Sequence, residues 1–381
     1  MWATPRPGRR SGHPNRFPKA TPGGTSVTRS VRGPRWATRW RFPTAVIACM
    51  LAGTVATACS SSGKGASSSP PTITPTSSSS TSSPSGAGGT WSAAKSIDPG
   101  NGLVSVSCPS TTDCVAVDAN TGHSGNGGNA FTYNGTSWSA PVVVDTVTSL
   151  VSASCPTTSF CAAVGDDGSA FTYNGSSWTT SSGADTNPFE AVSCASSSFC
   201  VAVDNNAGAL TWNGSTWSSP QKVGSGNGGP NAAVSCASAS FCAAIGGNGV
   251  YTFNGSSWSS EHALGSGANE PVAVSCPTAS FCVAAGMDGS VYTYNGTSWS
   301  SGAKVDVVNG TSTGLGGVTC SSASFCMAFE GGGNWYVTYN GRAWSGAAMA
   351  DPGTVFKSVS CASASFCMAV DGDTNAFSWH S

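Results

Sequence analysis

Cysteines are the residues of this sequence whose spacing points most directly to chemistry. Fourteen of the 16 form seven pairs with five residues between the partners: Cys108 with Cys114, Cys155 with Cys161, Cys194 with Cys200, Cys236 with Cys242, Cys276 with Cys282, Cys320 with Cys326, and Cys361 with Cys367. Cysteines at facing ends of a short hairpin lie close enough for a disulfide. A zinc site usually needs about four ligands, and a redox motif has two residues between its thiols. The spacing therefore predicts seven hairpin disulfides and an oxidising compartment.

Acidic side chains recur at a second fixed place, after the second strand expected in each repeat unit. They are Asp118, Asp166, Asp167, Asp204, Asp288, Glu330, Asp371 and Asp373. Loops that follow the same strand of successive units share one face, so we expect these carboxylates to form a ligand-binding surface there. Two carboxylates about 5 to 10 Å apart would also suit glycoside hydrolysis. The alternative is that they are ordinary turn residues, because Asp hydrogen-bonds readily to nearby backbone.

The remaining motifs predict no cofactor, no metal site and no catalytic residue. Asp371-Gly-Asp373-Thr-Asn375 is similar to the start of a calcium loop, but Ala376 stands where an EF-hand needs glycine. A different calcium geometry stays open. The four histidines are scattered along the chain and support no zinc site.

The elements that position these residues follow from the repeat, whose period of 39 to 47 residues is typical of a propeller blade. Val104-Ser-Val106-Ser-Cys108 alternates as a strand does, and Cys200-Val-Ala-Val203 is apolar or small throughout, as in a strand buried on both faces. The third strand has an aromatic-Thr-aromatic pattern. Asn134-Gly135 then predicts a tight turn with positive φ angles, and Trp138 opens the fourth strand.

The two ends of the repeat region complement each other. The seventh unit stops in its third strand at Phe377-Ser378-Trp379, whereas Gly89-Thr90-Trp91-Ser92 matches the opening of a fourth strand and precedes the first unit. An N-terminal strand that completes the last blade would close the ring and remove two exposed edges. The sequence therefore predicts an all-β, seven-bladed β-propeller of four-stranded blades over residues 90–381.

The N-terminal region has the order of a secretory signal. Residues 1–58 hold ten Arg and Lys and no acid, and they end in an apolar run of about 15 residues, shorter than the roughly 20 needed to cross a bilayer. Ala56-Thr57-Ala58-Cys59 resembles the lipobox of bacterial lipoproteins, which implies a lipid on Cys59; an ordinary cleaved signal is the alternative. Residues 59–89 are rich in Ser, Thr, Pro and Gly and predict a flexible tether.

The run Tyr133-Asn134-Gly135-Thr136-Ser137-Trp138 resembles the Asp-box (BNR) turn of sialidase-like propellers, with Tyr133 where that family has Asp. The resemblance implies the same turn and packing, and the box is not catalytic even within the family. Sialidase activity would need an arginine triad. Residues 90–381 contain a single arginine, Arg342, so the sequence argues against that activity.

Charge and anchor together give an expectation for function. Residues 59–381 carry six basic and 17 acidic residues, a net charge of −11, which argues against a nucleic-acid partner. We expect a monomeric, non-catalytic propeller that binds a protein or carbohydrate ligand of the cell envelope. Its lipid anchor would hold it on the outer face of the cell membrane. The alternative is a secreted glycoside hydrolase that uses paired carboxylates on the propeller face.

Overall fold

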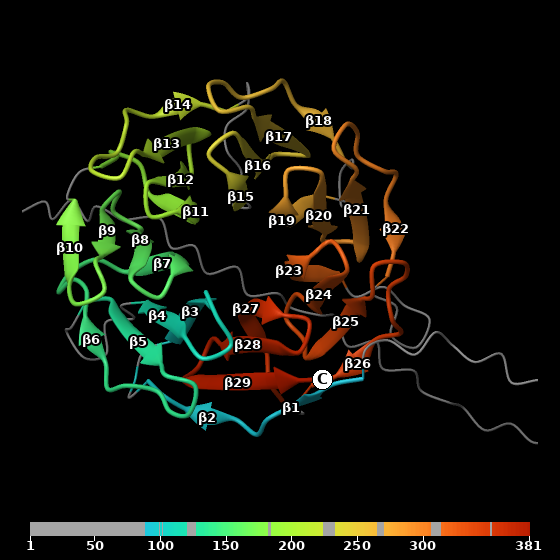
Figure 1. Cartoon of the computed structure of the whole chain (residues 1–381), viewed down its shortest axis with the longest axis horizontal. Coiled ribbons are helices and arrows are strands. Elements are labelled where there is room, and N and C mark those ends of the chain that lie inside the picture. Colours follow the sequence, from blue (N-terminus) through green and yellow to red (C-terminus); the bar gives the residue numbers. More distant parts are fainter. Residues whose placement is uncertain are drawn as a thin grey trace, which may run out of the picture. The chain divides into compact units, whose positions relative to one another are not determined.

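The computed structural model describes residues 88–98, 100, 102–119, 127–181, 184–223, 233–264, 270–305, 314–350 and 353–381. These residues form strands and turns arranged as seven separate antiparallel sheets around a ring (Figure 1). The predicted all-β, seven-bladed propeller is confirmed. In the described residues no helix has the length and apolar character to cross a membrane.

Blades one to six each contain four strands in sequence order from the centre outward. Blades one to three contain β3 (Gly102–Ser107), β4 (Cys114–Ala119), β5 (Asn129–Tyr133) and β6 (Val142–Val143); β7 (Leu150–Thr157), β8 (Phe160–Gly165), β9 (Ala170–Tyr173) and β10 (Trp178–Ser181); and β11 (Phe189–Ser196), β12 (Phe199–Asp204), β13 (Gly208–Trp212) and β14 (Gln221–Lys222). Blades four and five contain β15 (Ala233–Ser238), β16 (Phe241–Gly246), β17 (Gly249–Phe253) and β18 (His262–Ala263); and β19 (Pro271–Thr278), β20 (Phe281–Gly286), β21 (Ser290–Tyr294) and β22 (Ala303–Lys304). Blade six contains β23 (Leu315–Ser322), β24 (Phe325–Glu330), β25 (Trp335–Tyr339) and β26 (Ala348–Met349).

The N-terminal segment completes blade seven, as the sequence patterns at residues 89–92 and 377–379 predicted. It contains β27 (Phe356–Ser363), β28 (Phe366–Asp371) and β29 (Asn375–His380), and β1 (Thr90–Trp91) and β2 (Lys95–Ser96) pair with β29 along its outer side. Trp91 lies opposite Trp379, and Lys95 lies opposite Ala376. The ring is therefore closed by hydrogen bonds between the two ends of the described chain.

The core consists of seven apolar clusters, each formed between two neighbouring blades. The second strand of each blade supplies side chains to the clusters on both of its faces, as with Val115 and Ala116 in blade one. This arrangement explains why these strands lack the polar alternation of a half-exposed strand.

All seven predicted disulfides are present, with Cα–Cα distances of 3.9 to 4.1 Å. Each lies between the end of the first strand and the start of the second, as in blade three, where the two cysteines face each other in the ladder. The cross-links therefore stay inside the blades and do not connect one blade to the next. In blade order they join Cys108 to Cys114, Cys155 to Cys161, Cys194 to Cys200, Cys236 to Cys242, Cys276 to Cys282, Cys320 to Cys326, and Cys361 to Cys367.

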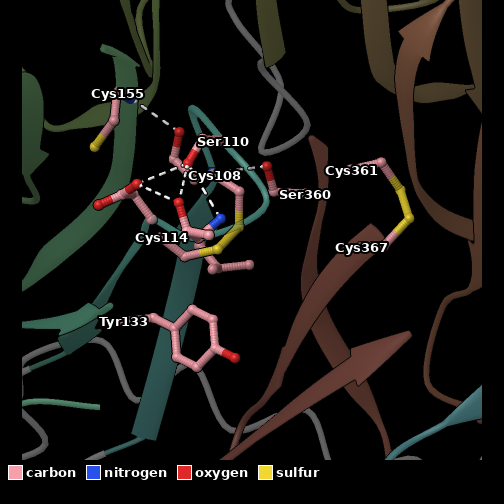
Figure 2. Close-up of a disulfide and its surroundings, with 12 residues drawn as sticks. Cys108, Ser110, Cys114, Tyr133, Cys155, Ser360, Cys361 and Cys367 are labelled. Carbon is pink, nitrogen blue, oxygen red and sulfur yellow. Dashed lines mark hydrogen bonds between the residues drawn. A yellow bond between two sulfur atoms is a disulfide. The ribbon is translucent and has the colours of Figure 1, made fainter. Parts of the chain in front are cut away.

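Hydrogen bonds accepted by hydroxyl groups connect the blades. The residue before the first cysteine of each blade, Ser in six blades and Thr319 in blade six, accepts a hydrogen bond from the backbone N–H of the first cysteine in the following blade. Figure 2 shows two of these cysteines, Cys108 beside Ser360 of blade seven, and Cys155 of blade two. The polar positions of the first strand thus form a belt through all seven blade junctions.

Aromatic stacking reinforces the same junctions near the disulfides. The Phe before the second cysteine of one blade stacks on the aromatic residue that ends the third strand of the next blade, as Phe281 does on Tyr339 at 6.2 Å. Five junctions have such a stacked pair, and between blades six and seven Phe325 makes a tilted contact with Trp379, the last residue but one of β29. Blade one has Asp113 in place of Phe, so the junction with Tyr173 of blade two lacks it.

The predicted Asn-Gly turns are present in altered form. In each of the six turns Gly has a φ between +86° and +95°, but Asn does not have a positive φ. Asn acts through its side chain instead: Asn134 Oδ1 accepts the backbone N–H groups of Thr136 and Ser137 at 3.1 and 2.9 Å. The expectation that Trp opens the fourth strand holds only for β10. In the other five blades with this turn the Trp makes an isolated bridge, and a two-residue strand follows later.

Candidate functional site

The loops of the ring form two sets on opposite faces, because neighbouring strands are antiparallel. We call one set the acidic face: the loops from the second to the third strand of a blade, and those from one blade to the next. The other set, the disulfide face, joins the first strand to the second and the third to the fourth. All the described Asp and Glu residues except Asp113 and Glu261 lie at the acidic face.

All eight acids predicted as ligand-binding residues lie on the acidic face, but three of them are buried. Asp118, Asp204 and Asp371 are 0%, 1% and 5% exposed. Asp118 accepts hydrogen bonds from the backbone N–H and the amide of Asn129 at 2.5 and 2.8 Å, and Asp371 does the same with Asn375 at 2.9 and 2.7 Å. These carboxylates stabilise the turn of their own blade, the alternative role that the sequence left open.

The other five acids are more accessible. Asp166, Asp167 and Asp373 are exposed, and Asp288 and Glu330 are partly exposed. Asp167 accepts hydrogen bonds from the N–H of Ser169 and the hydroxyl of Thr148, both at 2.9 Å. The structure therefore brings Asp166 and Asp167 together in one loop, whereas Asp288, Glu330 and Asp373 come from three other blades.

Asp288 has the one ion pair formed within the described chain, with Lys304 at 2.5 Å. Partial burial opposes ionisation of Asp288, but hydrogen bonds from Lys304 and Ser290 outweigh it and lower the pKa of the carboxyl below its ordinary value. The carboxylate is thus ionised and has its counter-ion in the outermost strand of the same blade.

Five further acids at this face were not predicted from the sequence as ligand-binding residues. Asp98, Asp145 and Asp185 follow the outermost strand of a blade, and Glu190 and Glu270 lie at the start of the innermost strand of the next. The signal was a repeated apolar or small residue followed by Asp, as in Ile97-Asp98, Val144-Asp145 and Ala184-Asp185. These acids add to the negative charge of the acidic face.

Asp185 and Asp204 form a close pair of carboxyl groups between blades two and three. Both are buried, at 6% and 1% exposure. Burial raises the pKa of Asp185, hydrogen bonds from the N–H groups of Asn187 and Thr186 only partly offset this, and the Asp204 carboxyl raises it further. The amide of Asn187 lies between the two, with Nδ2 3.4 Å from Asp185 Oδ1 and 3.2 Å from Asp204 Oδ2.

The outer rim has grooves between blades that contain aromatic side chains. A groove of about 360 Å³ between blades seven and one is lined by Tyr133, Trp138 and Lys95, among others. Another of about 350 Å³, between blades two and three, is lined by Trp217 with Ser, Thr, Ala and Pro residues. Neither groove belongs to the predicted acidic site, and both combine an aromatic surface with hydroxyl groups.

Cys59, the predicted lipid attachment site, and the predicted leader lie outside the described residues, as does almost all of the tether over residues 59–89. The lipid anchor and the two N-terminal boundaries therefore remain predictions.

Comparison with known proteins identifies the fold alone. No family model matches the sequence, and no curated protein matches it. Solved structures do match: YCF48 bound to D1 peptide (TM-score 0.58, 11% identity, 76% of this chain and 95% of that chain) and YCF48 from Cyanidioschyzon merolae (0.57, 14%, 76% and 99%). A streptogramin B lyase structure is also similar (0.62, 9%, 76% and 97%). At these identities the likeness extends to the β-propeller architecture and no further.

Proposed function

We propose that this chain is a non-catalytic, envelope-tethered propeller that binds a protein ligand through its acidic face. The observation that carries the proposal is an excess of negative charge on one face. Thirteen of the 15 described Asp and Glu residues lie there, against four described lysines at the same strand ends, Lys95, Lys222, Lys304 and Lys357. An excess of one charge on one face attracts ligands of the opposite charge and speeds their association. The ligand is therefore expected to present Lys or Arg side chains.

A second observation favours a binding role over chemistry. A glycoside hydrolase needs two carboxyl groups that reach the substrate, one of them as acid. Asp118, Asp204 and Asp371 are buried and engaged by their own turns. We therefore rank glycoside hydrolysis below a binding role. One structural neighbour, YCF48 bound to D1 peptide, is consistent with a peptide as ligand for a ring of this kind.

The experiment uses the full chain and a fluorescent peptide rich in Lys and Arg. Binding is measured by anisotropy at about 20 and 300 mM salt, with a Glu-rich peptide as the charge-reversed control. The test variant replaces Asp166, Asp167, Glu330 and Asp373 by their amides. The control variant replaces Asp113, in the β3–β4 loop of the disulfide face, by Asn. Salt-sensitive binding that only the first variant loses supports the proposal. Equal binding by both variants, or no binding at low salt, contradicts it.

A carbohydrate ligand is the second candidate, and the rim grooves are the observation that favours it. Trp217 in one groove has neighbours with hydroxyl groups and no charged residue lining the same groove. Ligand pockets commonly combine an aromatic wall with a few polar groups. A glycan panel separates the two candidates: retention of a neutral glycan that Trp217→Ala abolishes would move the site to the outer rim. Release of reducing ends would instead support the hydrolase.

A further inference from the structure

The junction between blades two and three carries a further site, separate from the ligand-binding role proposed above. We propose that Asp185, Asn187 and Asp204 bind a calcium ion there. The site lies where the loop after β10 meets the end of β12, on the acidic face.

The first argument is an orphaned carboxylate oxygen. Asp185 is 6% exposed, and its Oδ2 is buried and accepts no hydrogen bond from any described residue. The adjacent carboxyl of Asp204 is 1% exposed and uses Oδ1 to accept the N–H groups of Asn206 and Gly208 at 2.8 and 2.6 Å. Two buried carboxylates without a cation repel each other and lose their hydration. Neither forms an ion pair with a described Lys, Arg or His.

The second argument is a comparison with the other junctions of the same ring. Between blades one and two, Thr148 joins Asp145 and Asp167: its N–H donates to Asp145 at 2.8 Å and its hydroxyl donates to Asp167 at 2.9 Å. In blade five, Lys304 neutralises Asp288. Between blades two and three, in contrast, the joining group is the Asn187 amide at 3.2 and 3.4 Å, the outer limit of a hydrogen bond. Each carboxyl accepts short backbone hydrogen bonds within its own loop, but no strong donor joins the two carboxyls and no base neutralises them.

The third argument is the identity of the donor atoms. Rotation of the Asn187 amide by half a turn replaces its NH2 group with Oδ1 at the same place, which provides a third oxygen beside the two carboxylates. Calcium prefers Asp carboxylates, Asn carbonyls, backbone carbonyls and water in a flexible geometry. No His or Cys takes part, which disfavours zinc. Nowhere in the described chain do three or more Asp, Glu, His or Cys residues form a metal-binding group, so backbone and water oxygens would complete this one.

Gly208 keeps the arrangement compact. A Cβ at this position would lie 2.3 Å from Asp204 Oδ2. The absence of a side chain lets the carboxylate lie against the backbone of its own turn, where it is held by the Gly208 N–H.

The test measures thermal unfolding and calcium binding of the full chain after chelation. With a dissociation constant near 1 mM, typical of extracellular modules, about 10 mM calcium should raise the melting temperature by about 2 to 4 °C. Asp185→Asn, which keeps the shape, should lose this shift and one calcium equivalent by calorimetry. The control Glu190→Gln removes one charge five residues away and should keep both. The proposal is overturned if calcium does not raise the melting temperature of the wild type, or if Asp185→Asn shows the same rise and binds the same number of calcium ions. A higher melting temperature of Asp185→Asn than of the wild type, both without calcium, supports the repulsion between the two carboxylates.

Discussion

Ser360 of the last blade accepts a 3.0 Å hydrogen bond from the backbone N–H of Cys108 in the first blade. The two residues are 252 positions apart in the sequence, and the bond completes a belt that also passes through the six other junctions. Together with the strand pairing of Trp91 and Trp379, it makes the ring continuous.

Substitution of Ser360 by Ala should lower the free energy of unfolding by about 1 kcal/mol, because it leaves a buried N–H without an acceptor. Urea denaturation provides the measurement. Ser363→Ala is the matched control, since the hydrogen bonds of that hydroxyl with the hydroxyl and N–H of Ser365 lie within its own exposed hairpin. Equal losses in the two variants would show that the belt does not stabilise the ring.

Replacement of both Cys194 and Cys200 by Ser should cost about 2 kcal/mol, mainly because a short closed loop is lost from the unfolded chain. The double variant should still fold, because the other six disulfides and the blade junctions remain. Peptide mapping of the unreduced wild-type protein should find seven links, each within one hairpin. A link between two blades would contradict the structure.

Asp113→Phe should stabilise the protein by about 1 kcal/mol, a gain expected from an added aromatic pair. Asp113 occupies the position where the other six blades have Phe, and Tyr173 of blade two is the aromatic residue equivalent to the partner of that Phe. The Asp113 carboxylate accepts hydrogen bonds from Ser110 and Thr112 at 2.7 and 2.9 Å, and both substitutions lose them. Comparison with Asp113→Ala therefore isolates the effect of the added phenyl ring. If Asp113→Phe melts at no higher temperature than Asp113→Ala, a phenyl ring does not fit at this junction.

The Asp288–Lys304 pair predicts a pH dependence of stability. Because its pKa is lowered in the folded state, Asp288 stabilises the fold above the ordinary Asp pKa of about 3.9, and the contribution disappears as the pH falls through the lower folded value. Lys304→Met should therefore cost about 0.5 kcal/mol at pH 6 and less at pH 3, the small size reflecting a lysine that is half exposed. Lys222→Met, in the equivalent strand of blade three, serves as the control. A cost for Lys304→Met that grows on acidification would contradict this assignment.

The sequence predicted the blades, the disulfides and the closing strand because each depends on local patterns that the repeat shows many times. The belt of hydrogen bonds between blades was not predictable in the same way. The alternation of side chains along β3 places Ser107 on the side away from the core, but it does not identify the partner, Cys155, which belongs to the next blade. Burial of the acids was not predictable either. Asp204 is the last residue of β12, at the position of Gly165 in β8, and it is buried where Gly208 leaves room for it, whereas Asp166 lies one position later and is exposed.

The acidic face as the binding surface is the central claim, and hydrogen–deuterium exchange of the full chain with and without the Lys- and Arg-rich peptide tests it most directly. The account predicts slower exchange in the loops after β8, β24 and β28, with unchanged exchange in the Asn-Gly hairpins of the disulfide face. Protection of those hairpins, or of the grooves around Trp138 and Trp217, with no change in the acidic loops, would contradict it.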